Sequence, residues 1–266
     1  MNPDTSSPDS PRQTPESIRA MKSRREKVAV LTAYDYPTAR LLDESGMDVL
    51  LVGDSLGMVV LGYPDTTHVT MDDMVHHVRA VARAAKRALI VADLPIASYD
   101  LPDQAITNAR RLVTAGAQAV KLEGGRDRAE EIEEIVQAGI PVMAHLGMLP
   151  QSVKIEGGYK IKGRTTAEAD GLLEDAHRVQ QAGAFAVVLE LVLGEVAARI
   201  SAALDIPTIG IGSGPDCDGQ VLVSHDLIGL FPWFTPKFVE PHGNVAEQIR
   251  SSASAFIAKT KHPKPA

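Results

Sequence analysis

The chain has 266 residues, of which 44% are hydrophobic and 4% aromatic, and it carries a formal net charge of −7. An acidic chain lacks the clustered basic field that phosphate binding needs, which argues against a general nucleic-acid binder and against adhesion to anionic membranes. The single cysteine, Cys217, excludes an intramolecular disulfide and a thiolate metal site. We therefore expect a globular protein in a reducing, cytoplasmic compartment, with a small molecule as its partner.

Both ends of the chain differ from the segment between them. Residues 1–16 are rich in Pro, Ser and Asp and contain no apolar stretch, so we expect a disordered tail rather than a secretory signal or membrane anchor. Residues 259–266 predict a second, frayed tail. Apolar runs such as 49–52 are far shorter than the roughly 20 residues that cross a bilayer. No linker interrupts residues 17–258, which predicts a single domain.

The segment between the tails alternates between two kinds of pattern. A short helix is expected first, within residues 15–28, with Ile18 and Met21 on its apolar side. Short β-branched runs, typical of buried strands, then recur at 28–34, 49–54, 89–95, 119–125, 141–147, 186–190, 207–213 and 236–239. Segments of helical period lie between them at 70–86, 101–117, 126–139, 166–183 and 193–204.

Eight such units in this length predict an α/β fold of a particular kind. A TIM (β/α)8 barrel needs roughly 250 residues, which matches the chain, and strands that alternate with helices form parallel sheets. A doubly wound open sheet is the alternative, because it has the same alternation.

Polar side chains end the predicted strands, at the edge where a TIM barrel carries its active site. They are Asp54 and Ser55 after the second run, Asp93 at the third, Lys121 and Glu123 in the fourth, His145 in the fifth and Glu190 in the sixth. Carboxylates that converge on one barrel mouth repel each other unless a cation lies among them. Oxygen ligands without a Cys/His cluster favour Mg²⁺ over zinc.

Taken one at a time, these residues have simpler explanations. Asp54 or Asp93 alone can be the N-cap of the helix that follows its strand. Lys121 can form an ion pair with Glu123, whose side chain shares its face of the strand, or with another carboxylate. His145 can be a supporting core histidine. An unpaired carboxylate at Glu190 would be costly unless the site uses it.

Two loops could also contribute to a site at the barrel mouth. The glycines of GIGSG (210–214) can bring backbone N–H groups to an anion, or can form a tight turn without a ligand. The segment 149–164 is basic, contains glycine and is too long for an ordinary connection. It predicts either a lid over the barrel mouth or a mobile surface loop.

Several motifs together resemble one enzyme family, in family order and at family spacing across residues 16–258. They are LTAYDYPTA (31–39), VGDSLGMVVLGY (52–63), ADLP (92–95), VKLEGG (120–125), HLGMLPQSV (145–153), GGYKIKGR (157–164), VLE (188–190), IPTIGIGSG (206–214) and DGQVLV (218–223). The sequence resembles the ketopantoate hydroxymethyltransferases.

This resemblance implies a TIM barrel, a Mg²⁺ ion, a homodecamer and a one-carbon transfer. The implied reaction moves a hydroxymethyl group from 5,10-methylenetetrahydrofolate to 3-methyl-2-oxobutanoate through a Mg-stabilised enolate. Its product, 2-dehydropantoate, leads to pantothenate and coenzyme A.

The resemblance also implies a role for each strand-end residue. Asp54, Asp93 and Glu123 match the metal-binding positions. Ser55 and Lys121, with Asp54 and Asp93 nearby, match substrate-binding positions, and His145 matches a residue of the pocket. Glu190 matches the proton acceptor.

Two other functions fit parts of the pattern. A lyase or mutase of the phosphoenolpyruvate mutase and isocitrate lyase kind also holds a 2-oxo acid on acidic strand ends. Such enzymes carry a reactive cysteine in a catalytic loop, whereas Cys217 lies in a Gly/Asp-rich turn after the seventh run. A non-catalytic sensor barrel would bind a 2-oxo acid without exchanging its proton.

Overall fold

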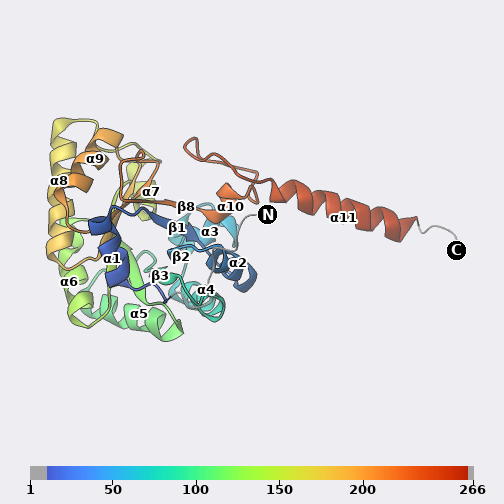
Figure 1. Cartoon of the computed structure of the whole chain (residues 1–266), viewed down its shortest axis with the longest axis horizontal. Helices are drawn as coiled ribbons and strands as arrows, with labels where there is room; N and C mark the ends of the chain where they lie inside the picture. Colours follow the sequence, from blue (N-terminus) through green and yellow to red (C-terminus); the bar gives the residue numbers. More distant parts are fainter. Residues whose placement is uncertain (1–10, 263–266) are drawn as a thin grey trace. The chain divides into compact units, whose positions relative to one another are not determined.

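Eight parallel strands close into one barrel in chain order (Figure 1). The structure is a computed structural model that describes residues 11–262. The strands are β1 (Val28–Thr32), β2 (Val49–Val52), β3 (Leu89–Asp93), β4 (Ala119–Glu123), β5 (Val142–Gly147), β6 (Ala186–Glu190), β7 (Thr208–Ile211) and β8 (Gly219–Leu222). The predicted TIM barrel is confirmed, and the open doubly wound sheet is wrong.

The helices before β8 are α1 (Pro15–Arg24), α2 (Tyr36–Glu44), α3 (Leu56–Val59), α4 (Met71–Ala84), α5 (Pro102–Ala115), α6 (Ala129–Gln137), α7 (Val153–Glu156), α8 (Thr166–Gln181) and α9 (Gly194–Ala203). Two more, α10 (Ser224–Leu227) and α11 (Val245–Lys261), follow β8 in the chain. Three 3₁₀ turns, η1 (Thr66–His68), η2 (Arg126–Arg128) and η3 (Pro150–Ser152), lie in the connections. Helices α4, α5, α6 and α8 follow one another around the barrel (Figure 1). All five helices predicted between strands are present.

The ends of these helices follow from local sequence. At the start of α4, the Thr70 side chain accepts the Asp73 N–H, and the Asp73 side chain accepts the Thr70 N–H in return. This capping box satisfies two backbone donors that the first helical turn leaves open. Helix α5 begins at Pro102 and ends before Gly116, whose φ of +119° suits a residue without a Cβ.

The barrel interior is apolar at its N-terminal end. Side chains of a strand alternate between the interior and the helices. The buried apolar cluster inside the barrel, which we call the apolar layer, includes Val30, Leu51, Val91, Met143 and Val188. Ile18 and Met21 of α1 belong to the same buried cluster, so α1 closes this end of the barrel.

Polar contacts hold α1 in that place. Lys22 Nζ lies 2.6 Å from Oδ2 of Asp218 and donates to the carbonyl of Ser201 at 2.7 Å. The predicted N-terminal helix is therefore a structural closure of the barrel.

The eighth strand is not where the sequence predicts it. Residues 236–239 form a turn in which the Val239 N–H donates to the Pro236 carbonyl, and Phe238 is exposed. Proline cannot donate to a strand ladder, which disfavours this run. Gly219–Leu222 closes the barrel instead. Glycine at position 219 permits the close approach to β1, because a Cβ there would lie 2.4 Å from the Val28 carbonyl oxygen.

The two ends of the chain also differ from the predicted tails. Helix α1 already begins at Pro15 and α11 continues to Lys261, so parts of the segments 1–16 and 259–266 are helical. Residues 1–10 and 263–266 lie outside the described residues. None of the helices in the described part of the chain is long and apolar enough to span a bilayer.

The chain divides into two compact units, Met1–Val221 and Leu222–Ala266, where the sequence predicts one domain over 17–258. In the second unit, the Val245 N–H donates to the Ile228 carbonyl, and Ala246 donates to Gly229. Helix α11 is 17 residues long, and Ala246 is its one buried residue among those described.

Candidate active site

The predicted site residues form a charged layer at the C-terminal end of the barrel interior. Asp93, Glu123 and Glu190 are the last residues of β3, β4 and β6. In register, Asp93 pairs with Lys121, and Glu123 pairs with His145. Because parallel strands end at the same edge of the barrel, these side chains meet at its mouth.

Asp54 joins this layer from the turn after β2. Its backbone N–H donates to Oδ2 of Asp93 at 3.1 Å, and Asp93 Oδ1 lies 3.1 Å from Nζ of Lys121. A Cβ at Gly53 would lie 2.9 Å from Oγ of Ser55, so a larger residue there would require the Ser55 side chain to move. Ser55 Oγ in turn lies 2.8 Å from the Tyr34 hydroxyl.

These contacts decide between the simpler explanations. Neither aspartate caps a helix, since the N-cap of α3 is Ser55 and its side chain makes no capping bond. Lys121 does form an ion pair, with Asp93 rather than with Glu123, its neighbour on the strand.

His145 lies between the lysine and the carboxylate of Glu190. Lys121 Nζ is 3.3 Å from Nδ1 of His145, and His145 Nε2 is 3.3 Å from Oε2 of Glu190. Burial, reinforced by the Lys121 charge, holds the pKa of His145 well below its ordinary value, so the imidazole is neutral. Because lysine can only donate, Nδ1 accepts and the imidazole proton is on Nε2, facing Glu190.

Burial also changes the acidity of the carboxyl groups. Asp54, Asp93, Lys121, Glu123 and His145 are only 3–4% exposed. Burial raises the pKa of Glu190 to about 7, against a smaller opposing effect of Lys121.

Mutual repulsion adds to burial in the rest of the cluster. Burial and then the Asp93 charge raise the pKa of Asp54, and burial and then the Asp54 charge raise the pKa of Glu123. Burial alone would lower the pKa of Lys121, but Asp93, Glu123 and Asp54 together raise it. The cluster therefore holds more negative charge than its lysine can balance.

The donor chemistry of the cluster suits a hard divalent cation. Asp93 Oδ1 is buried and, despite the nearby lysine, makes no hydrogen bond of good geometry within residues 11–262. Across these same residues, no three His, Cys, Asp or Glu side chains are arranged as a complete ligand set. Mg²⁺ does not need such a cage, because it is usually held by one or two carboxylates together with water and substrate oxygens. Asp54 and Asp93 fit that role, with Glu123 as a direct or water-mediated contact.

Gln151 is part of the site, although sequence reasoning did not select it. It lies in η3, is 6% exposed, and donates from Nε2 to Oδ2 of Asp54 at 2.8 Å. Its backbone N–H donates to Oε2 of Glu123 at 3.0 Å. The available signal was its place in the motif HLGMLPQSV, six residues after His145.

The predicted lid, 149–164, is held at several points. Lys154 Nζ lies 3.0 Å from Oδ2 of Asp65 and donates to Oγ1 of Thr67 at 2.9 Å. Further along, the Lys162 N–H donates to the Leu191 carbonyl, and Leu193 donates back to Lys162. The segment therefore connects the end of β5 to the loop that follows Glu190.

The glycine-rich turn after β7 supports the neighbouring strand. Ser213 Oγ donates to the Leu189 carbonyl at 2.7 Å and accepts the Val192 N–H at 3.0 Å. Gly212 and Gly214 have φ angles of +62° and +81°. These bonds fit the tight-turn interpretation and shape the chain on both sides of Glu190.

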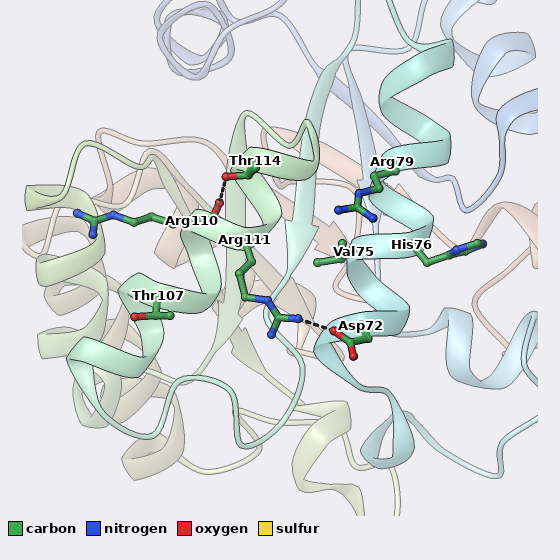
Figure 2. Close-up of a pocket in the computed structure, with 8 residues that line it drawn as sticks. All are labelled: Asp72, Val75, His76, Arg79, Thr107, Arg110, Arg111 and Thr114. Carbon is green, nitrogen blue, oxygen red and sulfur yellow. Dashed lines mark hydrogen bonds and ion pairs between the residues drawn. The ribbon is translucent and has the colours of Figure 1, made fainter.

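A separate groove of about 630 Å³ lies on the outer surface, between α4 and α5. Figure 2 shows Arg111 of α5 reaching toward Asp72 of α4, with which it forms an ion pair, while Arg79 and Arg110 lie to either side. None of the predicted site residues lines this groove. Its side chains are those of a solvated helix pair, so the barrel mouth is the candidate active site.

Residues 12–264 match the sequence model of the family described as ketopantoate hydroxymethyltransferase. The chain belongs to this family. A relative from Moorella thermoacetica, named 3-methyl-2-oxobutanoate hydroxymethyltransferase, is 56% identical over 256 residues, covering 95% of each chain. One of the same name from Acetivibrio thermocellus is 55% identical over 251 residues, covering 94% of this chain and 89% of its own. The predicted family is confirmed, and with it a transferase.

Solved structures with the same fold belong to other enzymes. Phosphoenolpyruvate phosphomutase from Streptomyces platensis subsp. rosaceus has a TM-score of 0.64 at 17% identity, covering 94% of this chain and 88% of its own. 2,3-Dimethylmalate lyase, a member of the PEP mutase/isocitrate lyase superfamily, has a TM-score of 0.61 at 16% identity, covering 94% and 89%.

At such identities the likeness concerns the fold alone and does not favour the lyase or mutase alternative. Cys217, the only cysteine, is fully buried, and burial raises the pKa of its thiol. A buried thiol of raised pKa is a poor nucleophile.

Proposed function

We propose that this enzyme transfers a hydroxymethyl group from 5,10-methylenetetrahydrofolate to 3-methyl-2-oxobutanoate and forms 2-dehydropantoate. The relatives' shared name supports the substrate. The observation that carries the mechanism is Glu190, largely buried and 3.3 Å from neutral His145, beside the acidic cluster. A base of pKa near 7 in that position suits removal of a proton from carbon.

The acidic cluster binds the substrate's 2-oxo acid end in this proposal. Asp54 and Asp93 would hold Mg²⁺, with Glu123 in direct or water-mediated contact. A bound Mg²⁺ would withdraw electrons from the 2-oxo acid and so lower the cost of enolate formation. Lys121, together with Ser55, neutralises the substrate carboxylate.

Glu190 removes the C3 proton, and the C–H electron pair becomes the C2–C3 double bond of the enolate. The neutral imidazole of His145 lies beside this carboxylate, with Nε2 3.3 Å from Oε2 but no hydrogen bond of good geometry among the described residues. The enolate carbon then attacks the methylene carbon carried by the folate, which breaks one of that carbon's two C–N bonds, and the released nitrogen takes the proton that Glu190 removed. Water cleaves the second C–N bond, so that its hydroxyl remains on the product as the hydroxymethyl oxygen and its proton goes to the other nitrogen.

The lid and the wider setting belong to the same proposal. Closure by residues 149–164 excludes water from the mouth and protects the enolate from early protonation. The product enters pantothenate and coenzyme A synthesis, and a buried, unpaired Cys217 is compatible with the reducing cytoplasm.

A homo-oligomer, and specifically a homodecamer, is proposed as the working form. Support comes from the second unit, where Trp233, Phe234, Phe256 and Ile257 are all exposed. Exposed apolar side chains in such number mark interaction surfaces. Light scattering after gel filtration measures the assembly directly, and a monomer at working concentration would contradict it.

Proton exchange tests the chemistry without the folate. The protein is incubated with 3-methyl-2-oxobutanoate and Mg²⁺ in D₂O, and the C3 proton is followed by NMR. We expect exchange in the wild type and a loss of about 10²–10⁴-fold in Glu190→Gln, the usual contribution of a general base. Binding without exchange in the wild type would instead support the sensor barrel, and undiminished exchange in the variant would remove Glu190 as the base.

A further inference from the structure

Gln151 is an uncharged side chain buried among the acidic residues of the barrel mouth. Its Nε2 donates to Asp54 Oδ2 at 2.8 Å and to the Leu94 carbonyl at 3.0 Å. Its backbone N–H donates to Glu123 Oε2 at 3.0 Å. One residue of η3 therefore contacts two carboxylates from separate segments, the turn after β2 and the end of β4.

The orientation of the Gln151 amide follows from its neighbours. Asp54 Oδ2 and the Leu94 carbonyl only accept hydrogen bonds, so the NH₂ group must face them. The amide oxygen is then directed to the Tyr99 hydroxyl, which donates to it at 2.6 Å. Every polar atom of the amide is thus assigned a partner of the correct kind.

Tyr99 fixes this orientation from the other side. It is 5% exposed, its hydroxyl also lies 3.3 Å from the Glu123 carbonyl oxygen, and the Arg128 guanidinium lies 5.4 Å from its ring centre. A buried tyrosine held in this way has little rotational freedom. If the amide were reversed, its oxygen would face two acceptors.

These contacts orient the two carboxylates through only one oxygen atom of each. Each gives one oxygen to Gln151, Oδ2 in Asp54 and Oε2 in Glu123. Oε1 of Glu123 lies 3.7 Å from His145 Nδ1, beyond hydrogen-bond distance, and can contact a ligand. Mutation of a partner that orients a metal ligand typically lowers metal affinity by about 10–100-fold.

We propose that Gln151 is a positioning residue, which together with Tyr99 holds Asp54 and Glu123 in the orientation that binds Mg²⁺. This inference rests on the proposed function, because it assigns those carboxylates to the metal. It also gives the start of the 149–164 segment a direct connection to the site. Gln151 touches neither substrate nor reacting atoms in this role.

Calorimetric titration with Mg²⁺, in the absence and in the presence of 3-methyl-2-oxobutanoate, tests the proposal. Gln151→Met keeps the length and removes the amide, and it should raise the Mg²⁺ dissociation constant by about 10–100-fold. Tyr99→Phe removes one hydrogen bond and should raise this constant by about threefold. Gln137→Met, the same change at an exposed glutamine of α6, should leave it unchanged.

Proton exchange separates positioning from a general structural role. In Gln151→Met, saturating Mg²⁺ should restore most of the exchange rate, with the apparent Mg²⁺ constant raised and the unfolding midpoint of the metal-free protein near that of wild type. An unchanged Mg²⁺ constant in a folded Gln151→Met would overturn the proposal. If that variant does not fold, an unchanged constant in Tyr99→Phe overturns it.

The same measurements distinguish this inference from the proposed reaction. Weakened Mg²⁺ binding in the variant, with no exchange in the wild type, supports Gln151 and contradicts the reaction. Exchange in the wild type with equal Mg²⁺ constants contradicts Gln151 alone. A wild-type chain that binds no Mg²⁺ overturns both.

Discussion

The two layers of side chains inside the barrel stand on the same strands and differ completely in chemistry. Val91 and Val188 belong to the apolar layer that α1 closes, and Asp93 and Glu190 follow each of them by two residues. Alternation along a strand directs both members of each pair to the interior. Two residues along a strand therefore separate an apolar layer that stabilises the barrel from a charged layer whose buried carboxylates repel one another.

This difference shows how one scaffold serves two purposes. The apolar layer needs only volume and water exclusion, which many side chains supply. The charged layer depends on individual partners, since Lys121, Gln151 and His145 each contact a particular carboxylate. Substitutions that exchange the properties of the two layers test the comparison most directly.

The largest effect is expected from a charge in the apolar layer. Val91→Asp places a carboxylate among the apolar side chains of this cluster, and it should destabilise the protein by at least about 3 kcal/mol. Urea unfolding of the metal-free protein measures this. Asp93→Asn, two residues further, should change stability by less than about 1 kcal/mol, because the Asp54 N–H keeps its acceptor and the charges of Asp54 and Glu123 still stabilise Lys121. Equal losses at the two positions would contradict the distinction between the layers.

The next effect concerns the pH dependence of stability. Because the folded-state pKa of Glu190 is raised from its ordinary value near 4.5 to about 7, the folded protein binds the proton more tightly than the unfolded chain does. Without Mg²⁺, this group therefore stabilises the fold fully below about pH 4.5, and that stability is lost as pH rises toward 7, amounting to at most about 3 kcal/mol.

Urea unfolding from pH 4.5 to 8 measures the pH effect, with Glu190→Gln as the comparison. The variant should show a flatter pH dependence than wild type, because glutamine does not titrate. Stability that rises through this window by the same amount in both proteins would contradict the raised pKa.

A smaller effect is expected at the closed end of the barrel. Lys22→Met removes the ion pair with Asp218 and the bond to the Ser201 carbonyl, and it should cost about 1–2 kcal/mol. Proton exchange should remain at the wild-type rate, because α1 closes the end opposite the site. Arg19→Met, on the exposed side of α1, is the control. A loss of exchange in the folded Lys22 variant would show that the two layers are coupled.

The smallest effect is expected at the lid. Lys154 is more than half exposed, so its ion pair with Asp65 contributes at most about 1 kcal/mol. Lys154→Met should increase tryptic cleavage at Lys160 and Lys162 and lower the exchange rate by about fivefold at most. Lys86→Met, at an exposed position after α4, should change neither. Unaltered cleavage would mean that this contact does not hold the segment.

The barrel and most of its site follow from patterns within short stretches of sequence. Seven of the eight predicted strands are present, because β-branched runs bounded by turns mark buried strands wherever they pack. The eighth was misplaced. Gly219–Leu222 is short and contains a glycine that only a close approach to Val28 explains, and that approach is visible only in the folded barrel.

Gln151 shows the same limit within the site. Its partners Asp54, Tyr99 and Glu123 lie 97, 52 and 28 residues away along the chain. A neutral amide has no charge pattern or periodicity that would select it from the other glutamines. Its role depends on three loops meeting at one point, which local sequence does not encode.

The sequence by itself determined the alternation of strands and helices, the acidic strand ends at Asp93, Glu123 and Glu190, and the family. These follow because side-chain period and strand direction are local properties that carry over to the barrel. Only the tertiary structure decided that Lys121 pairs with Asp93, that His145 is neutral and that Gln151 orients two carboxylates. Those outcomes depend on distance and burial, which exist only once the strands have closed.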